Sequence, residues 1–179
     1  MTSMSLMDSG RSRLVIIDFQ ARLMPAIHDG SRLVANARRL VDAALLLGVP
    51  VLMTEENPAG LGTTVTELAD AGPVIAKMSF DSCGEPAFLA ALADDEELIL
   101  CGCEAHVCFG QTVLSLLARK RRVFVVQDAV GSRAPESKEV ALRRMERHGA
   151  EIVTTEMVVF EWLRTAEHPQ FRAASKLIK

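Results

Sequence analysis

Six short runs of branched apolar residues recur along the chain and constrain its fold more than any other feature. None of them is longer than five residues, and each is apolar on both faces. Runs of this kind are typical of strands in a parallel sheet that helices cover on both sides. We therefore predict strands at 14–17, 49–53, 74–76, 98–100, 123–126 and 152–153.

Amphipathic stretches separate these runs. Apolar residues repeat at helical spacing through 33–45, and Gly48 follows them as a C-terminal stop. Similar patterns predict helices around 113–117, at 137–148 and at 156–163. Strands that alternate with helices imply right-handed crossovers. The expected fold class is therefore α/β, a three-layer αβα domain with a doubly wound, mostly parallel sheet of about six strands.

A single domain is expected to span residues 1–179, because the sequence shows no linker, low-complexity tract or internal repeat. The first segment is polar, with scattered methionines, and we expect residues 1–11 to form a flexible tail that includes Met7.

Composition and charge exclude several classes of partner. The net charge is −3 and aromatic residues make up 4% of the chain, which argues against phosphate binding and base stacking. The one basic cluster, 119–122, closes a helical pattern, where cations suit the helix C-terminus. We expect no nucleic-acid partner.

Membranes and secretion are not expected either. No apolar stretch approaches the roughly 20 residues that a membrane span needs, and the start lacks the apolar core of a signal peptide. Four cysteines without secretory context favour free thiols in a reducing compartment. The sequence predicts a cytoplasmic protein with no membrane partner.

Polar residues that directly follow the apolar runs are the first candidates for chemistry, because ligands of open parallel sheets bind beyond the carboxyl ends of the strands. They are Asp18 and Gln20, the segment 54–57, Lys77, the segment 102–108, and Asp128.

Cys108 is the most distinctive of these residues. It stands near the start of a predicted helix, where unpaired N–H groups and the helix dipole favour thiolate and can hold an oxyanion. A lone cysteine at a helix start is more often a small buried hydrophobe.

Asp18 is either the base for the Cys108 thiol or a structural carboxylate, and Lys77 either stabilises charge or is a surface lysine. Together the three form an activated nucleophile.

Other polar residues receive structural interpretations. His106 lies too close to Cys108 on a tight turn to face it, so we expect a structural hydrogen bond. Glu104 is a possible support beside the nucleophile, and Asp128 a possible ion-pair partner of Arg133. Cys101 and Cys103 lack the CxxC spacing of a redox pair.

Three separated motifs resemble the isochorismatase-like cysteine hydrolases. They are Asp18-Phe19-Gln20, the segment 77–80, and the segment 102–108, in that order. The segment 55–68 and the C-terminal segment from His168 are similar to the small isochorismatase-domain proteins of this family. The resemblance covers nearly the whole chain and implies the Rossmann-like fold of that family.

The resemblance also implies a catalytic triad of Asp18, Lys77 and Cys108. It implies a non-proline cis peptide between Cys103 and Glu104, with the N–H groups of Glu104 and Cys108 as an oxyanion hole. Relatives of this family commonly assemble, so a homo-oligomer is expected.

Two departures narrow the expected activity. True isochorismatases lack the nucleophilic cysteine, which this chain has. Nicotinamidases of the family hold a metal with Asp and His residues shortly after the second strand, whereas Glu55 and Glu56 stand in this stretch without a histidine, and adjacent glutamates are more often solvated. We therefore expect no metal, no cofactor, and a substrate other than nicotinamide.

The expected reaction is hydrolysis of a carbon–nitrogen bond in a small-molecule substrate through a Cys108 thioester. Gln20, Asn57 and Phe80 are guesses for the pocket wall. The alternatives are an esterase or thioesterase with the same triad, a non-catalytic binding protein, and a redox sensor in which Cys108 is oxidised. The motifs do not specify the substrate.

Overall fold

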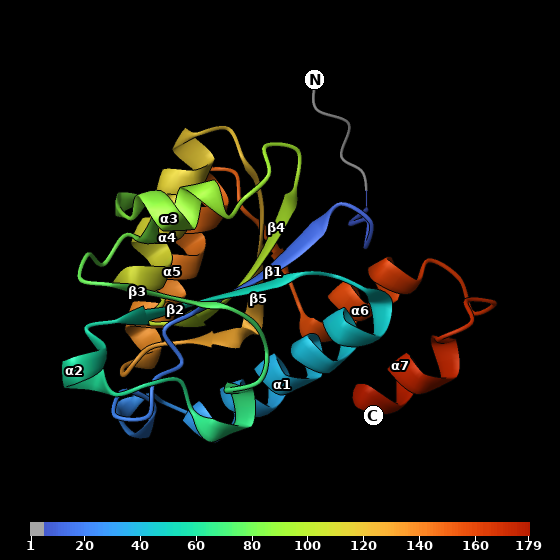
Figure 1. Ribbon diagram of the computed structural model, residues 1–179, viewed down its shortest axis with the longest axis horizontal. Helices are drawn as coiled ribbons and strands as arrows, with labels where there is room; N and C mark the ends of the chain where they lie inside the picture. The colour runs from blue at the N-terminus through green and yellow to red at the C-terminus, as the bar shows by residue number, and fades with distance from the viewer. Residues whose placement is uncertain (1–5) are drawn as a thin grey trace.

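The structure is a computed structural model that describes residues 6–179, and its centre is one parallel sheet of six strands (Figure 1). The strand order is β3-β2-β1-β4-β5-β6, and every pairing is parallel. All six predicted strands are confirmed, with bounds β1 Ser12–Ile17, β2 Val51–Glu56, β3 Val74–Lys77, β4 Glu97–Cys103, β5 Arg122–Gly131 and β6 Glu151–Val153.

Helices cover both faces of the sheet (Figure 1). One face carries α1 (Gly30–Leu47), α6 (Thr155–Leu163) and α7 (Phe171–Leu177), and the other carries α3 (Pro86–Ala90), α4 (Cys108–Ala118) and α5 (Pro135–Arg147). A short helix, α2 (Pro58–Leu61), and three 3-10 turns, Met24–Ala26, Thr66–Leu68 and Ser82–Gly84, lie in the connections. The expected three-layer αβα architecture is confirmed.

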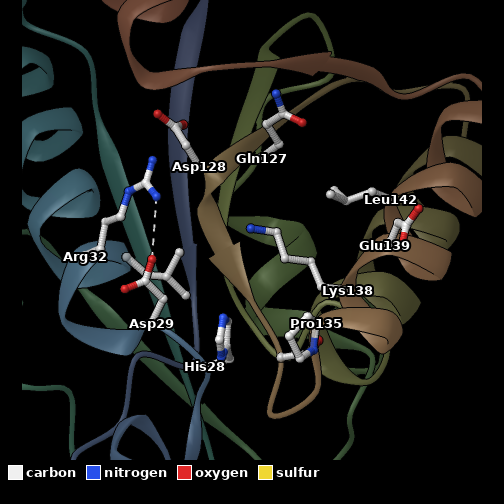
Figure 2. Close-up of a pocket in the computed structure, with 11 residues that line it drawn as sticks. His28, Asp29, Arg32, Gln127, Asp128, Pro135, Lys138, Glu139 and Leu142 are labelled. Carbon is white, nitrogen blue, oxygen red and sulfur yellow. Dashed lines mark ion pairs between the residues drawn. The ribbon is translucent and has the colours of Figure 1, made fainter.

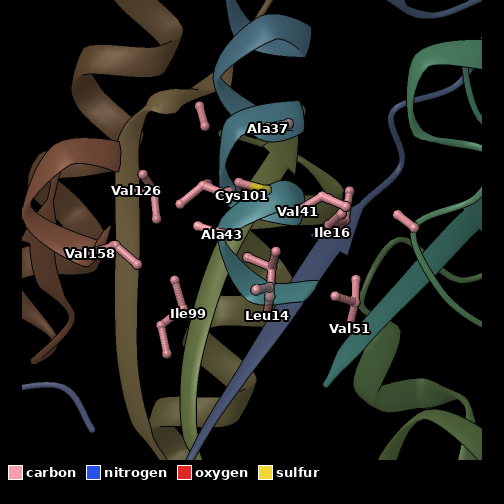
Figure 3. Packing of buried hydrophobic residues seen from close by; sticks show 14 of the residues in the cluster. Leu14, Ile16, Ala37, Val41, Ala43, Val51, Ile99, Cys101, Val126 and Val158 are labelled. Atoms are coloured by element: carbon pink, nitrogen blue, oxygen red, sulfur yellow. The ribbon is translucent and has the colours of Figure 1, made fainter. Parts of the chain in front are cut away.

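Successive side chains of β1 point to opposite faces of the sheet, which explains how helices pack on both faces. Leu14 and Ile16 point into the core beneath α1, whereas Val15 and Ile17 point into the core beneath α4. Figure 3 shows the first of these cores, in which Ala37 of α1 packs over the sheet. Because each strand is buried on both sides, its sequence is apolar without a polar alternation.

Two helix ends follow from backbone rules. Gly48 ends α1 in the left-handed conformation, with φ of 73°, and its N–H bonds the carbonyl of Ala44. Gly149 follows α5 with φ of 104°. Gly48 is the predicted stop of α1. The sequence did not predict α7, which packs on α1 at the end of the chain.

The expectation of a flexible tail is wrong for the segment from Met7 to Arg11. The Met7 side chain is fully buried in the core, and its N–H donates to Glu161 at 2.8 Å. Glu97 accepts from the Asp8 N–H and from Arg11, both at 2.8 Å. Contacts with residues so far along the chain hold this segment, which is why local sequence did not reveal them. Residues 1–5 of the expected tail lie outside the described residues.

The chain reverses its winding direction at β1. It first runs outward through β2 to β3, then returns to β4 on the other side of β1 and continues to β5 and β6. Doubly wound proteins bind ligands at the carboxyl ends of the strands on either side of such a reversal, which here are β1 and β4. Any ligand site of this sheet is expected there.

Candidate active site

The carboxyl ends of β1 and β3 and the start of α4 bring together the three residues of the predicted triad. Asp18 directly follows β1, Lys77 is the last residue of β3, and Cys108 is the first residue of α4. Asp18 has a φ of 52°, and its N–H bonds the carbonyl of Thr54 on β2 at 3.2 Å. The left-handed turn redirects the chain as it leaves the sheet, and a short polar residue tolerates it.

The Asp18 carboxylate is the centre of this cluster. Its Oδ2 lies 2.8 Å from Nζ of Lys77, and its Oδ1 accepts a hydrogen bond of 2.6 Å from the Thr54 hydroxyl. The Cys108 thiol lies beside this carboxylate, whose charge acts on it. One buried carboxylate therefore contacts the nucleophile, the cation and a fixed hydroxyl group.

Lys77 is fully engaged. Its side chain is completely buried, and besides Asp18 its ammonium group donates to the carbonyls of Ser79 and Phe80, at 3.1 and 3.2 Å. These contacts use all three hydrogens of the ammonium group. The alternative interpretation of Lys77 as a surface lysine is therefore wrong.

The Cys108 thiol does not have the low pKa that its place at a helix start led us to expect. Burial and the negative charge of Asp18 raise the pKa of Cys108 to about 12, whereas Lys77 acts in the opposite direction. Desolvation and a neighbouring carboxylate thus outweigh the helix N-terminus and the ammonium group. The resting group is a protonated thiol beside Asp18.

The turn between β4 and α4 presents two free N–H groups. Gly102 has a φ of 146°, and the peptide bond between Cys103 and Glu104 is cis, as the resemblance implied. Within the described residues, the N–H groups of Glu104 and Cys108 donate to no protein acceptor. Two unpaired donors beside the thiol fit the stabilisation of an oxyanion.

The side chain of Glu104 stabilises this turn. Its Oε2 accepts from the backbone N–H of Arg133 at 2.9 Å and from the Arg133 guanidinium at 3.1 Å. His106 bonds the Ser132 hydroxyl at 2.9 Å, which is the expected structural hydrogen bond. Asp128 does not pair with Arg133; it accepts from the N–H and hydroxyl of Thr155 at the start of α6.

The three guessed pocket residues have different surroundings. Gln20 is fully buried, and its amide group bonds the backbone of Glu56 and the carbonyl of Gly62. Its side chain therefore stabilises the end of β2. Asn57 caps α2 by accepting from the Gly60 N–H. Phe80 is 52% exposed beside Lys77.

Glu55 and Glu56 are buried, which corrects the expectation that they are solvated. Glu55 accepts from the N–H and hydroxyl of Thr64, at 2.6 and 2.8 Å. Glu56 lies at the end of β2, and burial raises the pKa of its carboxyl group, an effect that Lys77 opposes. In residues 6–179 no group of three or more His, Cys, Asp or Glu side chains is placed to hold a metal ion.

Thr54 was not singled out from the sequence, and Glu56 was considered only with Glu55 and expected to be solvated. The signal that would have found them is their spacing of two on one strand, which places both side chains on the same face.

The remaining thiols, Cys83, Cys101 and Cys103, are buried in the cores and form no disulfide. Burial raises the pKa of all three.

A concavity of about 430 Å³ lies away from the triad (Figure 2). Because β6 pairs with β5 only as far as Val126, β5 has an open edge beyond that point, and the concavity lies there between α1 and α5. Figure 2 shows Lys138 reaching into it, and desolvation lowers the pKa of this lysine. Arg32 on the other wall pairs with Asp29 at 3.5 Å.

The sequence matches the family model described as the isochorismatase domain over residues 12–157. Human isochorismatase domain-containing protein 2 is 40% identical over 174 residues, which cover 95% of this chain and 84% of the human protein. The chain therefore belongs to the isochorismatase family, and its described residues have the hydrolase fold of that family.

Two solved structures are similar to this chain in three dimensions. A structure of MAR1 ribonuclease from Caenorhabditis elegans is 35% identical, with a TM-score of 0.93 over 97% of this chain and 92% of that one. YcaC from Pseudomonas aeruginosa, solved with hexane-2,5-diol and covalent acrylamide, is 25% identical, with a TM-score of 0.88 over 99% of this chain and 98% of that one.

Membrane insertion through a helix finds no support in the structure. Among the described residues, no helix combines the length and the apolar character that crossing a bilayer requires.

Proposed function

We propose that this protein is a cysteine hydrolase that cleaves a carbon–nitrogen, amide-type bond of a small molecule through a thioester on Cys108. The observation that carries the proposal is the Asp18 carboxylate, which contacts both the Cys108 thiol and the Lys77 ammonium group. A buried carboxylate in this position can accept the thiol proton while the neighbouring cation stabilises the charge that forms.

The reaction begins with proton transfer from the Cys108 thiol to Asp18. The thiolate then attacks the substrate carbonyl carbon, and the oxyanion receives hydrogen bonds from the N–H groups of Glu104 and Cys108. When the carbon–nitrogen bond breaks, Asp18 returns the proton to the leaving amine. A water molecule, deprotonated by Asp18, cleaves the thioester and regenerates the thiol. No metal or cofactor takes part in these steps.

The raised pKa of Cys108 fits this order of events. Asp18 disfavours a thiolate while the carboxylate is ionised, and that repulsion ends when the carboxylate takes the proton. Lys77 remains charged beside the new thiolate and lowers its energy. The nucleophile therefore forms as part of the reaction instead of standing ready in the resting enzyme.

The covalent acrylamide in the YcaC structure supports a reactive nucleophile in this fold. Acrylamide is an electrophile that thiolates attack. The same reagent offers a test of this chain, in which Cys108 is expected to be modified. Mass spectrometry after proteolysis should locate the adduct there, and Cys108→Ala should abolish it. Modification of Cys83 in place of Cys108 would contradict the proposal.

Turnover is tested with a panel of small amides and matched esters, comparing wild type with Cys108→Ala. Cys108-dependent release of the amine, with an acyl adduct that hydroxylamine removes, is expected. A preference for esters would make the protein an esterase with the same triad. Absence of turnover on both classes would favour a binding protein, and a peroxide-induced disulfide between Cys103 and Cys108 would favour a redox sensor.

The name of the nematode relative makes RNA the third substrate to include in this panel. The basic cluster gives no support to an RNA surface, because two of its arginines have partners within the chain. Arg121 donates to the carbonyl of Ala93, and Arg122 pairs with Glu97 and Glu151. Cys108-dependent RNA cleavage would overturn the amide proposal.

We also propose that the protein acts as a homo-oligomer in the cytoplasm, on the basis of the family resemblance and the four free thiols. Light scattering of the purified protein tests the first part. A monomer at all concentrations would contradict it.

A further inference from the structure

Glu56 is a buried carboxylate beside the triad that the proposed reaction does not use. It is 9% exposed, and among the described residues its carboxyl oxygens accept no hydrogen bond and form no ion pair. Its backbone is held on both sides, because the Gln20 amide accepts from its N–H and donates to its carbonyl, each at 2.8 Å. The position of the residue is therefore fixed while its charged end is left unpaired.

The side chain of Glu56 lies on the same face of the sheet as the triad. Glu56 is two residues beyond Thr54, whose hydroxyl bonds Asp18, and side chains two apart on a strand share a face. Glu56 also pairs in register with Lys77 on β3. The charges of Lys77 and Asp18 both act on Glu56, and Glu56 in turn acts on the Cys108 thiol.

Lys77 has no hydrogen left to donate to Glu56. Lys77 donates its three hydrogens to Asp18 and to the carbonyls of Ser79 and Phe80. The positive charge of Lys77 and the negative charge of Asp18 balance each other, so an ionised Glu56 leaves the site with one negative charge in excess. Neither carboxyl oxygen of Glu56 is fully enclosed, although most of the residue is, so a ligand that brings a donor can reach them and hydrogen-bond to the charged end.

We propose that Glu56 is a specificity-determining residue that accepts a hydrogen bond from a nitrogen-bound hydrogen of the substrate. The site then selects small amides that carry such a donor, as an ammonium or an unsubstituted amide group, and disfavours carboxylates. The claim that the substrate is an amide that is cleaved rests on the proposed function. The claim that the site binds an N–H donor rests on Glu56 alone.

Two alkylating reagents of nearly equal size test the proposal on Cys108. Iodoacetamide carries an NH2 group where iodoacetate carries a carboxylate, and both react with the thiolate. The fraction of thiolate cancels in the ratio of the two rates on one protein. The ratio therefore reports how strongly the site prefers the NH2 group to the carboxylate. The two alkylation rates are measured by mass spectrometry of the Cys108 peptide. Their ratio is then divided by the corresponding ratio for free cysteine.

In wild type we expect the ratio to favour iodoacetamide by about tenfold or more over free cysteine, because a charged acceptor attracts the NH2 group and repels the carboxylate. Glu56→Gln, which keeps the shape and removes the charge, should bring the ratio at least severalfold closer to that of free cysteine. The matched control is Glu167→Gln, which removes one charge from an exposed position after α6. It should leave the ratio unchanged.

A wild-type ratio equal to that of free cysteine overturns the proposal, and so does a ratio that Glu56→Gln does not move. The wild-type measurement decides the question even if the variant fails to fold. Failure of the proposed function is distinguishable, because alkylation requires no turnover. A protein that prefers iodoacetamide through Glu56 but hydrolyses no amide would refute the hydrolase and support the binding role.

Discussion

Nζ of Lys77 lies 2.8 Å from Oδ2 of Asp18, and neither side chain is exposed to solvent. The two residues belong to strands that are not neighbours, because β2 lies between β3 and β1. The lysine therefore reaches across β2, and the Thr54 hydroxyl on that strand donates to the same carboxylate. This ion pair joins the edge of the sheet to its centre.

Lys77→Met should destabilise the protein, because it leaves the Asp18 carboxylate buried without its cation. Breaking one partner of a buried ion pair costs about 3–5 kcal/mol of the free energy of unfolding. The pKa of Cys108 should also rise, since Lys77 lowers it in the wild type. Urea unfolding and the pH dependence of alkylation measure the two effects.

The double variant Asp18→Asn/Lys77→Met is the control for the ion pair. It removes both charges, so its loss of stability should be smaller than the sum of the two single losses. Additive losses would show that the pair has no energetic coupling.

Asp18→Asn should separate the reactivity of the thiol from turnover. The amide cannot accept the thiol proton, so turnover should fall by about 10²- to 10⁴-fold. The pKa of Cys108 should nevertheless fall, because the negative charge of Asp18 raises it. Ultraviolet absorbance of the thiolate against pH measures the second effect, and an unchanged or higher pKa would contradict the assigned role of Asp18.

Stability should decrease in alkaline solution as the buried thiols lose their protons. The pKa of Cys108 rises from an ordinary value of 9.0 to about 12 in the folded protein, so the folded state holds this proton more tightly than the unfolded state does. The resulting stabilisation is complete below pH 9 and is lost as the pH rises toward 12. One such group changes the free energy of unfolding by about 1.4 kcal/mol per pH unit in this range.

Cys108→Ala tests that assignment. Its free energy of unfolding should fall less steeply with pH between 9 and 12 than that of wild type, by the contribution of one proton. Cys83, whose pKa is also raised to about 12, remains in both proteins and contributes equally to each. Parallel curves for the two proteins would show that the Cys108 thiol is not perturbed.

Gly102→Ala should disrupt the turn that carries the oxyanion donors. A Cβ atom there would lie 2.2 Å from the backbone oxygen of Ile17, and the φ of 146° is one that side chains rarely adopt. Gly48→Ala is the matched control, because Gly48 also has a positive φ but nothing lies within 4 Å of its Cβ position. We expect Gly48→Ala to cost about 1 kcal/mol and Gly102→Ala clearly more, measured by urea unfolding. Equal losses would contradict the steric argument.

The sequence predicted the sheet and the place of the triad because both depend on local patterns. The apolar runs mark the strands, and the residue after each run necessarily lies at the carboxyl edge of a parallel sheet. Asp18 and Lys77 could therefore be placed at that edge before any contact was known, and the family resemblance implied that they act together. The cis peptide between Cys103 and Glu104 came from the family motif and not from the residues themselves.

Long-range contacts explain what the sequence did not predict. The burial of Met7 depends on α6, and the burial of Glu56 depends on how β2 ends beside Gln20. The raised pKa of Cys108 depends on the balance of desolvation and two opposite charges, which no single motif encodes. The helix dipole favours the thiolate, but desolvation and the charge of Asp18 outweigh it, so the pKa of Cys108 is raised.

The cation of the site belongs to the least protected strand of the sheet. The four-residue β3 is an edge strand, and its first residue, Val74, is 43% exposed. Edge strands open with a smaller free energy than the central strands beside them. Fraying of β3 withdraws Lys77 from Asp18 while β1 and β4 stay folded. Inactivation by mild denaturant should therefore precede loss of secondary structure, so that activity reports the local stability of one edge and not that of the whole domain.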